Sequence, residues 1–166
     1  IETEKGKYIL TIYERRVKKT DLPFFSNLMV ELSKNGFVCP KPIANKDNNY
    51  ISDFNDKKFM IVSFLDGKSK SNLSPSECKI VGNQIARMHQ ITKNFKFTRN
   101  NDLSVRSWRG IFSQVKDKCN KIHAELPSLI EANLSSIEKE WPKNLPSGII
   151  HADLFSDNIF FKNNKF

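Results

Sequence analysis

The apolar run Phe59–Leu65 and the residues after it constrain the fold most. The run carries hydrophobic residues on both faces, which predicts a buried strand. The composition then changes abruptly to the polar stretch Lys68–Asn72. We therefore expect a boundary between two lobes here, with a sheet lobe at residues 1–66 and a helical lobe at residues 67–166.

The sheet lobe is predicted to contain strands and one helix. Residues 7–14 are rich in β-branched and aromatic side chains and predict a strand. A helix is expected to begin near Asp21-Leu-Pro23 and to end at Asn35-Gly36. Residues 50–54 and 58–65 should form a hairpin across the polar turn Asn55-Asp-Lys57, which gives a small antiparallel sheet.

The remaining residues are predicted to be mainly helical. Ser74-Pro-Ser-Glu77 has the pattern of a capping box with proline at the first helical position. Apolar residues then recur at helical spacing in three stripes, at residues 78–88, 108–122 and 130–141.

Charge and composition limit the class of protein. The net charge is +9, which would admit a polyanionic partner, but the excess is scattered lysine and only Arg15–Lys19 is a dense basic run. We therefore expect no nucleic-acid partner. No apolar run approaches the roughly 20 residues of a membrane helix, so we expect a cytoplasmic protein without membrane contact. The three cysteines indicate neither a disulfide framework nor a zinc site.

A polar cluster near the end of the chain suggests chemistry. His151, Asp153, Asp157 and Asn158 fall between Ile149-Ile150 and Ile159–Phe161, which predict two short buried strands. Carboxylate and amide oxygens suit a proton acceptor and a ligand for a hard cation such as Mg²⁺. The alternative for Asp153 is a carboxylate that caps a turn, and for His151 alone a structural role is favoured.

The loop His151-Ala-Asp-Leu-Phe-Ser-Asp-Asn158 resembles the catalytic loop of the kinase-like phosphotransferases, the superfamily of aminoglycoside phosphotransferases and choline kinases. Longer strings resemble the bacterial homoserine kinases of this superfamily, and the likeness extends over essentially the whole chain. It implies an α+β, protein-kinase-like two-lobe fold with a small antiparallel sheet lobe and a mainly helical lobe. These strings are residues 8–14, 21–25, 103–108 and 148–161.

The resemblance assigns roles within residues 149–161. Asp153 would accept the proton of the acceptor hydroxyl, and Asn158 would bind Mg²⁺. His151 would order the loop through hydrogen bonds. Asp157 would hold the acceptor or the loop.

The resemblance also implies ATP as the phosphate donor. The connector would meet adenine near Ser63 and Leu65, although a plain buried strand is an equal alternative. Thr11 stands where the superfamily usually has a phosphate-binding lysine. Arg15, Arg16 or Lys18 could replace it, and a solvated basic run is the favoured alternative.

The acceptor implied by the resemblance is L-homoserine, whose phosphorylation gives O-phospho-L-homoserine for threonine biosynthesis. Arg106 could bind its carboxylate and Trp108 could line the site, although a tryptophan here is more often core. Alternative functions are a kinase for choline, an aminoglycoside or methylthioribose, and a non-enzymatic module that binds nucleic acid or acts as a scaffold.

The family's glycine-rich phosphate loop and second metal-binding aspartate are missing from the sequence. We therefore expect an internal fragment, incomplete at both ends and inactive alone. The sequence predicts no oligomeric state.

Overall fold

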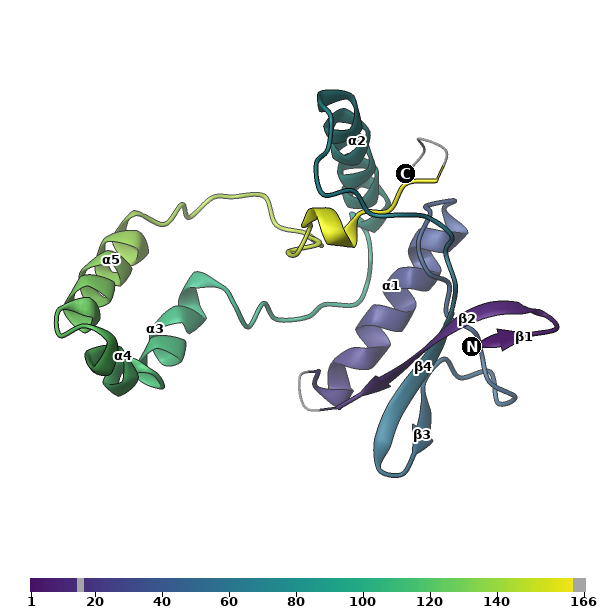
Figure 1. The fold of residues 1–166 in the computed structure, drawn as a ribbon, viewed down its shortest axis with the longest axis horizontal. Helices are drawn as coiled ribbons and strands as arrows, with labels where there is room; N and C mark the ends of the chain where they lie inside the picture. Colours follow the sequence, from purple (N-terminus) through teal and green to yellow (C-terminus); the bar gives the residue numbers. More distant parts are fainter. Residues whose placement is uncertain (15–16, 163–166) are drawn as a thin grey trace. The chain divides into compact units, whose positions relative to one another are not determined.

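The computed structural model describes residues 1–14 and 17–162. The chain divides into two compact units (Figure 1). Unit 1 comprises residues 1–99 and 148–166, and unit 2 comprises residues 100–147.

Unit 1 contains a four-stranded antiparallel sheet in the order β1-β2-β4-β3. Strand β2 is central and pairs with β4 over most of its length, with Leu10 opposite Ile61 and Thr11 opposite Met60. The predicted antiparallel sheet is confirmed. Its strands are β1 Glu2–Thr3, β2 Gly6–Tyr13, β3 Ser52–Phe54 and β4 Lys57–Ser63.

The β3–β4 hairpin closes on a tight turn. Asn55 and Asp56 both have left-handed backbone angles, with φ of 45° and 62°. Positive φ at both central residues is typical of the two-residue turn that matches the twist of antiparallel strands. The expected hairpin is therefore present, but Lys57 belongs to β4 and not to the turn.

Helix α1, Leu22–Lys34, follows the short 3-10 turn η1, Lys19–Asp21. At its end Gly36 has φ of 68°. The amide of Phe37 donates to the carbonyl of Leu32 at 3.0 Å, and the amide of Gly36 donates to that of Ser33 at 3.1 Å. This Schellman motif explains why the helix ends at the predicted Asn35-Gly36.

Helix α2, Pro75–Thr92, begins with the predicted capping box. The Ser74 hydroxyl accepts from the Glu77 amide at 3.3 Å, and the Glu77 carboxylate accepts from the Ser74 amide at 2.8 Å. Further along α2, Nη2 of Arg87 donates to the carbonyls of Asn35 and Gly36 at 3.1 and 3.0 Å. Arg87 thus joins α2 to the end of α1.

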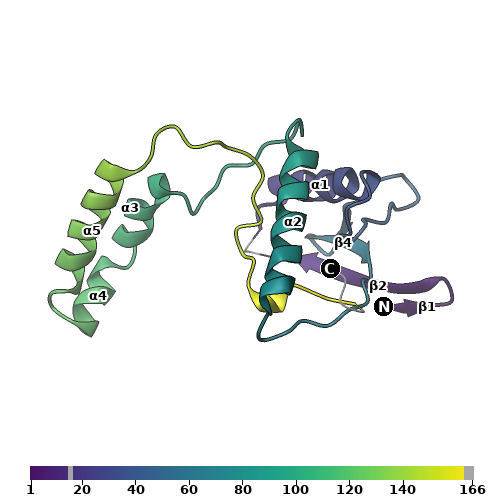
Figure 2. The same cartoon turned by 90° about the horizontal axis from the view of Figure 1, so that it is seen from above.

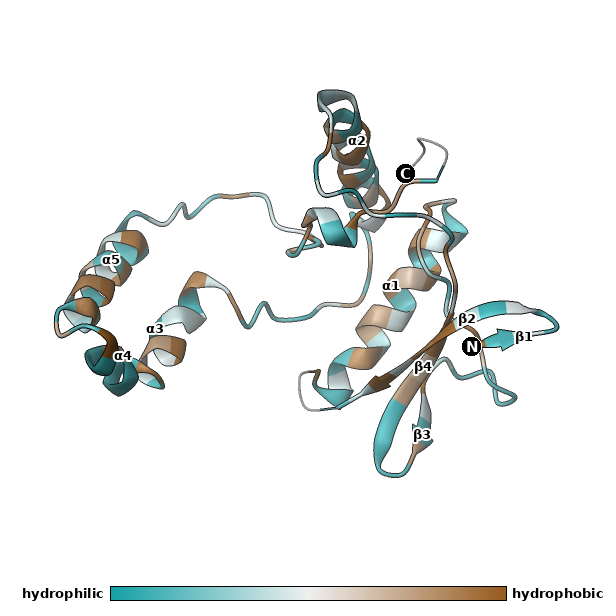
Figure 3. Cartoon of the chain, in the orientation of Figure 1, coloured by the Kyte–Doolittle hydropathy of each residue, from teal (hydrophilic) through white to brown (hydrophobic). Residues whose placement is uncertain are grey.

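The core of the sheet region centres on Leu22 and Met60, which are fully buried. Helix α1 lies beside the sheet in both views (Figures 1 and 2). Hydrophobic and hydrophilic bands alternate along α1 and α2, as expected for helices with one buried side (Figure 3). Within the described ranges, no helix is long and apolar enough to cross a membrane.

Unit 2 consists of α3 Val105–Ser113, α4 Lys116–Ile122 and α5 Leu126–Glu140. Phe112, Cys119 and Leu134 form its buried cluster, one from each helix. The single apolar stripe at residues 108–122 predicted one continuous helix. This was wrong, because the segment is divided into α3 and α4. The break turns α4 so that Cys119 packs against the same cluster as Phe112.

The strands predicted at both ends of the polar loop are not formed. Residues 149–150 have no strand assignment, and Ile150 is 58% exposed. At residues 159–161 the chain makes only an isolated bridge, between Phe161 and Lys68. Ile159 and Phe161 are nevertheless buried, since they pack on a helix and need no sheet.

The compact units do not follow the predicted lobes. Helix α2 remains with the sheet and α1 in unit 1, and residues 148–162 return to the same unit. The boundary between residues 66 and 67 stays a prediction about lobes.

Candidate active site

The polar loop is held on α2 by apolar residues on both of its sides. Ile159 and Phe161 form a buried cluster with Val81 of α2, and Leu154 packs against it. Between these anchors the short 3-10 turn η2, Ser156–Asn158, reverses the chain. The burial of the anchors fixes the loop while its polar side chains remain at the surface.

Asp153 and Asn158 are joined by their side chains. The amide nitrogen Nδ2 of Asn158 donates to the backbone carbonyl of Asp153 at 2.8 Å and to its carboxylate Oδ2 at 3.2 Å. Both side chains lie on the exposed surface of the loop. Because Nδ2 is directed at Asp153, the oxygen Oδ1 of Asn158 is left as the acceptor of this amide.

The residue before Asp153 has an unusual backbone. Ala152 has φ of 64°, in the left-handed region that costs a residue with a Cβ about 1–2 kcal/mol. Such strain is tolerated where the surrounding structure fixes the chain, and it is common beside functional residues. Asp153, which follows Ala152, accepts the hydrogen bonds of Asn158 from the η2 turn.

His151 and Asp157 are exposed residues of the same loop. Both residues are close to Asp153 in the sequence, and all three are exposed to solvent. Their roles in ordering the loop and in holding the acceptor stay predictions.

The donor chemistry of the loop fits a hard cation. Oδ1 of Asn158 and the carboxylate of Asp153 are oxygen ligands of the kind Mg²⁺ prefers, and Mg²⁺ keeps several waters in such sites. Over residues 1–14 and 17–162, no group of three or more His, Cys, Asp or Glu could hold a metal ion. That Asn158 binds a metal ion stays a prediction.

The predicted nucleotide connector leaves the end of β4. The hydroxyl of Ser63 accepts from the Lys41 amide at 2.9 Å, and the Ser63 amide donates to the Lys41 carbonyl at 2.9 Å. The hydroxyl and the amide of Ser63 are therefore both used in hydrogen bonds to Lys41, whereas Leu65 is 40% exposed. Arg15 and Arg16, predicted to contact the phosphates, lie outside the described residues.

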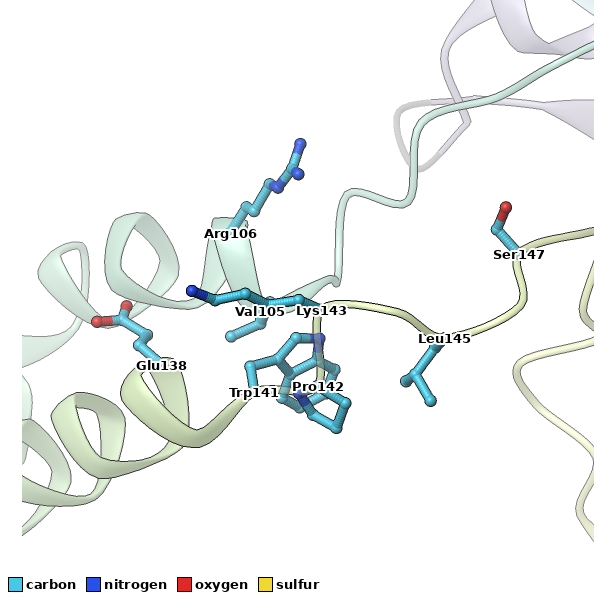
Figure 4. Close-up of a pocket in the computed structure, with 8 residues that line it drawn as sticks. All are labelled: Val105, Arg106, Glu138, Trp141, Pro142, Lys143, Leu145 and Ser147. Carbon is cyan, nitrogen blue, oxygen red and sulfur yellow. The ribbon is translucent and has the colours of Figure 1, made fainter.

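Arg106 of α3 lines an open cavity of about 700 Å³ in unit 2 (Figure 4). Glu138 also lines it, and its Oε2 accepts from Nε of Arg109 at 2.7 Å. Glu138 and then Glu131 raise the pKa of the Arg109 guanidinium, so this cation stays charged between α3 and α5. The other lining residues are Val105, Trp141, Pro142, Lys143, Leu145 and Ser147.

Trp108 has a structural place in unit 2. Its indole Nε1 donates to the Leu103 carbonyl at 2.8 Å. Its ring meets Trp141 edge to face, with 5.4 Å between the centroids. Its contact with a substrate stays a prediction, since Trp141 is the tryptophan that lines the cavity.

Several contacts around the loop were not anticipated from the sequence. Lys70 binds the Glu77 carboxylate and lies 5.5 Å from the centre of the Phe161 ring. Asp66 pairs with Lys162 at 2.7 Å. The contacts of Asp66 with Lys162 and of Lys70 with Phe161 join segments far apart in the chain, so no local spacing signals them, whereas Lys70 and Glu77 are only seven residues apart.

Comparison with known proteins identifies the family. A family model described as "Phosphotransferase enzyme family" matches residues 1–166. The chain belongs to this phosphotransferase family. The predicted membership of the kinase-like phosphotransferases is thereby confirmed.

Curated relatives of this phosphotransferase carry the name homoserine kinase. Those of Methylorubrum populi and Rhizobium meliloti are each 40% identical over 97% of the chain, which covers 50% and 49% of their lengths. The homoserine kinase of Mesorhizobium japonicum is 38% identical over 99% of the chain and 52% of its own length. The chain thus spans about half the length of the curated relatives it matches, in agreement with the expected fragment of a longer enzyme.

A solved structure supports the fold. The amicoumacin kinase hAmiN, in complex with AMP-PNP, Ca²⁺ and Ami, matches with a TM-score of 0.68 and 19% identity. The match covers 98% of this chain and 51% of that chain. The predicted kinase-like α+β fold is confirmed.

Proposed function

We propose that the protein containing this chain is a homoserine kinase. It would transfer the γ-phosphoryl group of ATP to the side-chain hydroxyl of L-homoserine and release O-phospho-L-homoserine and ADP. The observation that carries the proposal is the identity of about 40% with proteins named homoserine kinase over 97% of the chain. A cytoplasmic location and the absence of nucleic acid belong to the same proposal.

Asp153 is proposed to accept the hydroxyl proton and to align the oxygen with the γ-phosphorus. The backbone carbonyl and the carboxylate of Asp153 both accept hydrogen bonds from Nδ2 of Asn158. These bonds limit rotation of the two side chains. Phosphoryl transfer depends mainly on positioning and charge neutralisation, so a fixed carboxylate suits this role. His151 would order the loop and Asp157 would help to hold the acceptor.

Asn158 is proposed to bind Mg²⁺ through Oδ1, together with a ligand outside this chain. Bound Mg²⁺ neutralises charge on the transferring phosphoryl group. The backbone near Ser63 and Leu65 would meet adenine, and Arg15 and Arg16 would contact the phosphates.

Arg106, which lines the cavity of unit 2, is proposed to bind the carboxylate of the acceptor. A guanidinium binds a carboxylate through two parallel hydrogen bonds, which selects an amino acid over a simple alcohol. Trp141 lines the same cavity and is 41% exposed, so it offers an aromatic surface for the ammonium group, while Glu138 is already paired with Arg109. Trp108 would contribute by supporting Trp141.

A second candidate is a kinase for another small alcohol, because hAmiN has the same fold and is named for a different acceptor. The test is ADP release by the purified full-length protein with ATP, Mg²⁺ and each of L-homoserine, choline, methylthioribose and an aminoglycoside. Formation of O-phospho-L-homoserine with at least tenfold higher kcat/KM than any rival supports the proposal. A clear preference for another acceptor would replace it, and salt-sensitive RNA or DNA binding without turnover would favour a non-enzymatic module.

The 166-residue chain is expected to be inactive under the same assay. Robust turnover by these residues alone would contradict the assignment of further phosphate and metal ligands to other parts of the protein.

A further inference from the structure

The connector after β4 is paired with the residues that follow the polar loop. The amide of Lys68 donates to the Phe161 carbonyl at 3.0 Å, and the amide of Phe161 donates to the Lys68 carbonyl at 3.0 Å. This antiparallel bridge lies within unit 1. It joins the residues just after the predicted nucleotide connector to the segment that carries Asp153.

Gly67 lies next to the bridge, against Phe160 and Phe161. A Cβ at this position would lie 3.3 Å from Cβ of Phe160 and 3.4 Å from the carbonyl oxygen of Phe161. The Gly67 backbone is outside the left-handed region, so its conformation does not require glycine. A side chain is disfavoured here by close approach alone, since the neighbouring atoms would have to move by a few tenths of an ångström to admit a Cβ.

Contacts on either side strengthen this junction. The Phe161 side chain is buried in the cluster with Val81 and Ile159. One residue, Phe161, therefore both forms the backbone bridge and anchors the loop on α2. Asp66 pairs with Lys162, but both side chains are largely exposed and the pair adds little in water. The backbone bridge and the close packing at Gly67 therefore determine the spacing between residues 67–68 and residues 160–161.

We propose that Gly67 is a positioning residue, whose lack of a side chain sets the distance between the nucleotide connector and the Asp153–Asn158 pair. This inference rests on the proposed kinase function. The phosphate donor is held from the connector side, and the acceptor oxygen is aligned from the loop side. A misplacement of about 1 Å between reacting groups can cost on the order of 100-fold in rate.

The test uses Gly67→Ala and Gly67→Val in the full-length protein. We expect kcat to fall about tenfold for alanine and about 100-fold for valine, with the KM for homoserine changed less than threefold. Gly82→Ala is the matched control, because a Cβ at Gly82 of α2 meets no atom within 4 Å. Its kcat should remain within twofold of wild type.

A compensating change makes the test specific. Phe160 is 52% exposed, so Phe160→Gly removes the nearer clashing atom at little cost in burial. Combined with Gly67→Ala, it should restore at least half of the lost log kcat. Failure of this rescue, or wild-type kcat in Gly67→Val, would overturn the inference.

A second measurement separates the inference from the kinase assignment. Hydrogen exchange of the peptide covering residues 153–161 should quicken at least tenfold in Gly67→Val and remain unchanged in Gly82→Ala. An inactive wild-type enzyme with this exchange pattern would refute the proposed function and leave the junction intact. Unchanged exchange in the valine variant would refute the junction itself.

Discussion

Asn158 donates one amide nitrogen to both the backbone carbonyl and the carboxylate of Asp153, at 2.8 and 3.2 Å. The two residues proposed as proton acceptor and metal ligand therefore orient each other directly. The shorter bond goes to the backbone, so it survives substitution of the Asp153 side chain. This separation allows the chemistry of the carboxylate to be tested without releasing Asn158.

Asp153→Asn in the full-length enzyme should lower kcat about 10²–10⁴-fold, because the amide cannot accept the hydroxyl proton. Binding of AMP-PNP, measured by calorimetry, should change less than threefold. Asp47→Asn removes an exposed carboxylate elsewhere in unit 1 and should leave both values unchanged. An equal loss of nucleotide affinity in Asp153→Asn would argue against a transition-state role.

Asn158→Ala should raise the Mg²⁺ concentration for half-maximal rate by ~10-fold or more, since it deletes the proposed oxygen ligand. It also removes both hydrogen bonds to Asp153, so kcat at saturating Mg²⁺ should fall as well. A Mg²⁺ titration of the initial rate measures the two effects separately. An unchanged Mg²⁺ requirement would exclude Asn158 as a ligand.

Arg106→Met should raise the KM for homoserine by roughly 10–100-fold through loss of a charge-assisted hydrogen bond worth about 1.5–3 kcal/mol. The KM for ATP should stay constant. Lys118→Met on α4 deletes an exposed cation outside the cavity and serves as the control. Equal KM changes in both variants would point to a general loss of positive charge.

The capping box of α2 should contribute to stability. Ser74→Ala is expected to lower the free energy of unfolding by about 1 kcal/mol, because the Glu77 amide loses its acceptor. Denaturant unfolding of the full-length protein measures this, with the exposed Ser71→Ala as the control. A loss of similar size in Ser71→Ala would show that the cap is not its source.

The same cap should make the stability of the folded chain depend on pH. Lys70, followed by the amide and hydroxyl of Ser74, lowers the pKa of Glu77 from 4.5 to about 2 in the folded chain. The ionised carboxylate therefore contributes stability above pH 4.5, and this contribution is lost as the pH falls from 4.5 toward about 2. Glu77→Gln should show a smaller loss of stability over this interval than wild type, and parallel curves would contradict the assignment.

The β3–β4 turn allows a test of the fold. Asp56 has φ of 62°, so Asp56→Val should cost about 1–2 kcal/mol, whereas Asp56→Gly should match or exceed wild-type stability. Lys19 donates to the backbone oxygen of Asp56, a contact that both variants keep. Asp47→Val, at an exposed position outside the left-handed region, should be close to neutral in the same thermal melts.

Local patterns in the sequence predicted the elements whose causes are local. The Schellman end of α1 follows from Gly36, and the start of α2 follows from the Ser74–Glu77 box. The contact between Asp153 and Asn158 was also accessible from the sequence, because both residues lie in one short segment.

Contacts between distant segments were not predictable from periodicity. Ile150 has the apolar character of a strand residue, yet among residues 1–14 and 17–162 no strand pairs with it, and it is 58% exposed. The bridge between Lys68 and Phe161 depends on the path of the chain, which no local pattern encodes. The break between α3 and α4 was missed for a similar reason, since Cys119 fits both a continuous stripe and a turned helix.

The return of residues 148–162 to unit 1 has a consequence for biosynthesis. The α2 surface around Val81 is complete long before its partners Ile159 and Phe161 are made. At typical rates of translation, the intervening residues 100–147 take roughly 2–10 s to synthesise. During that interval the nascent chain carries an uncovered apolar patch, which is open to chaperones until the segment bearing Asp153 emerges and closes it.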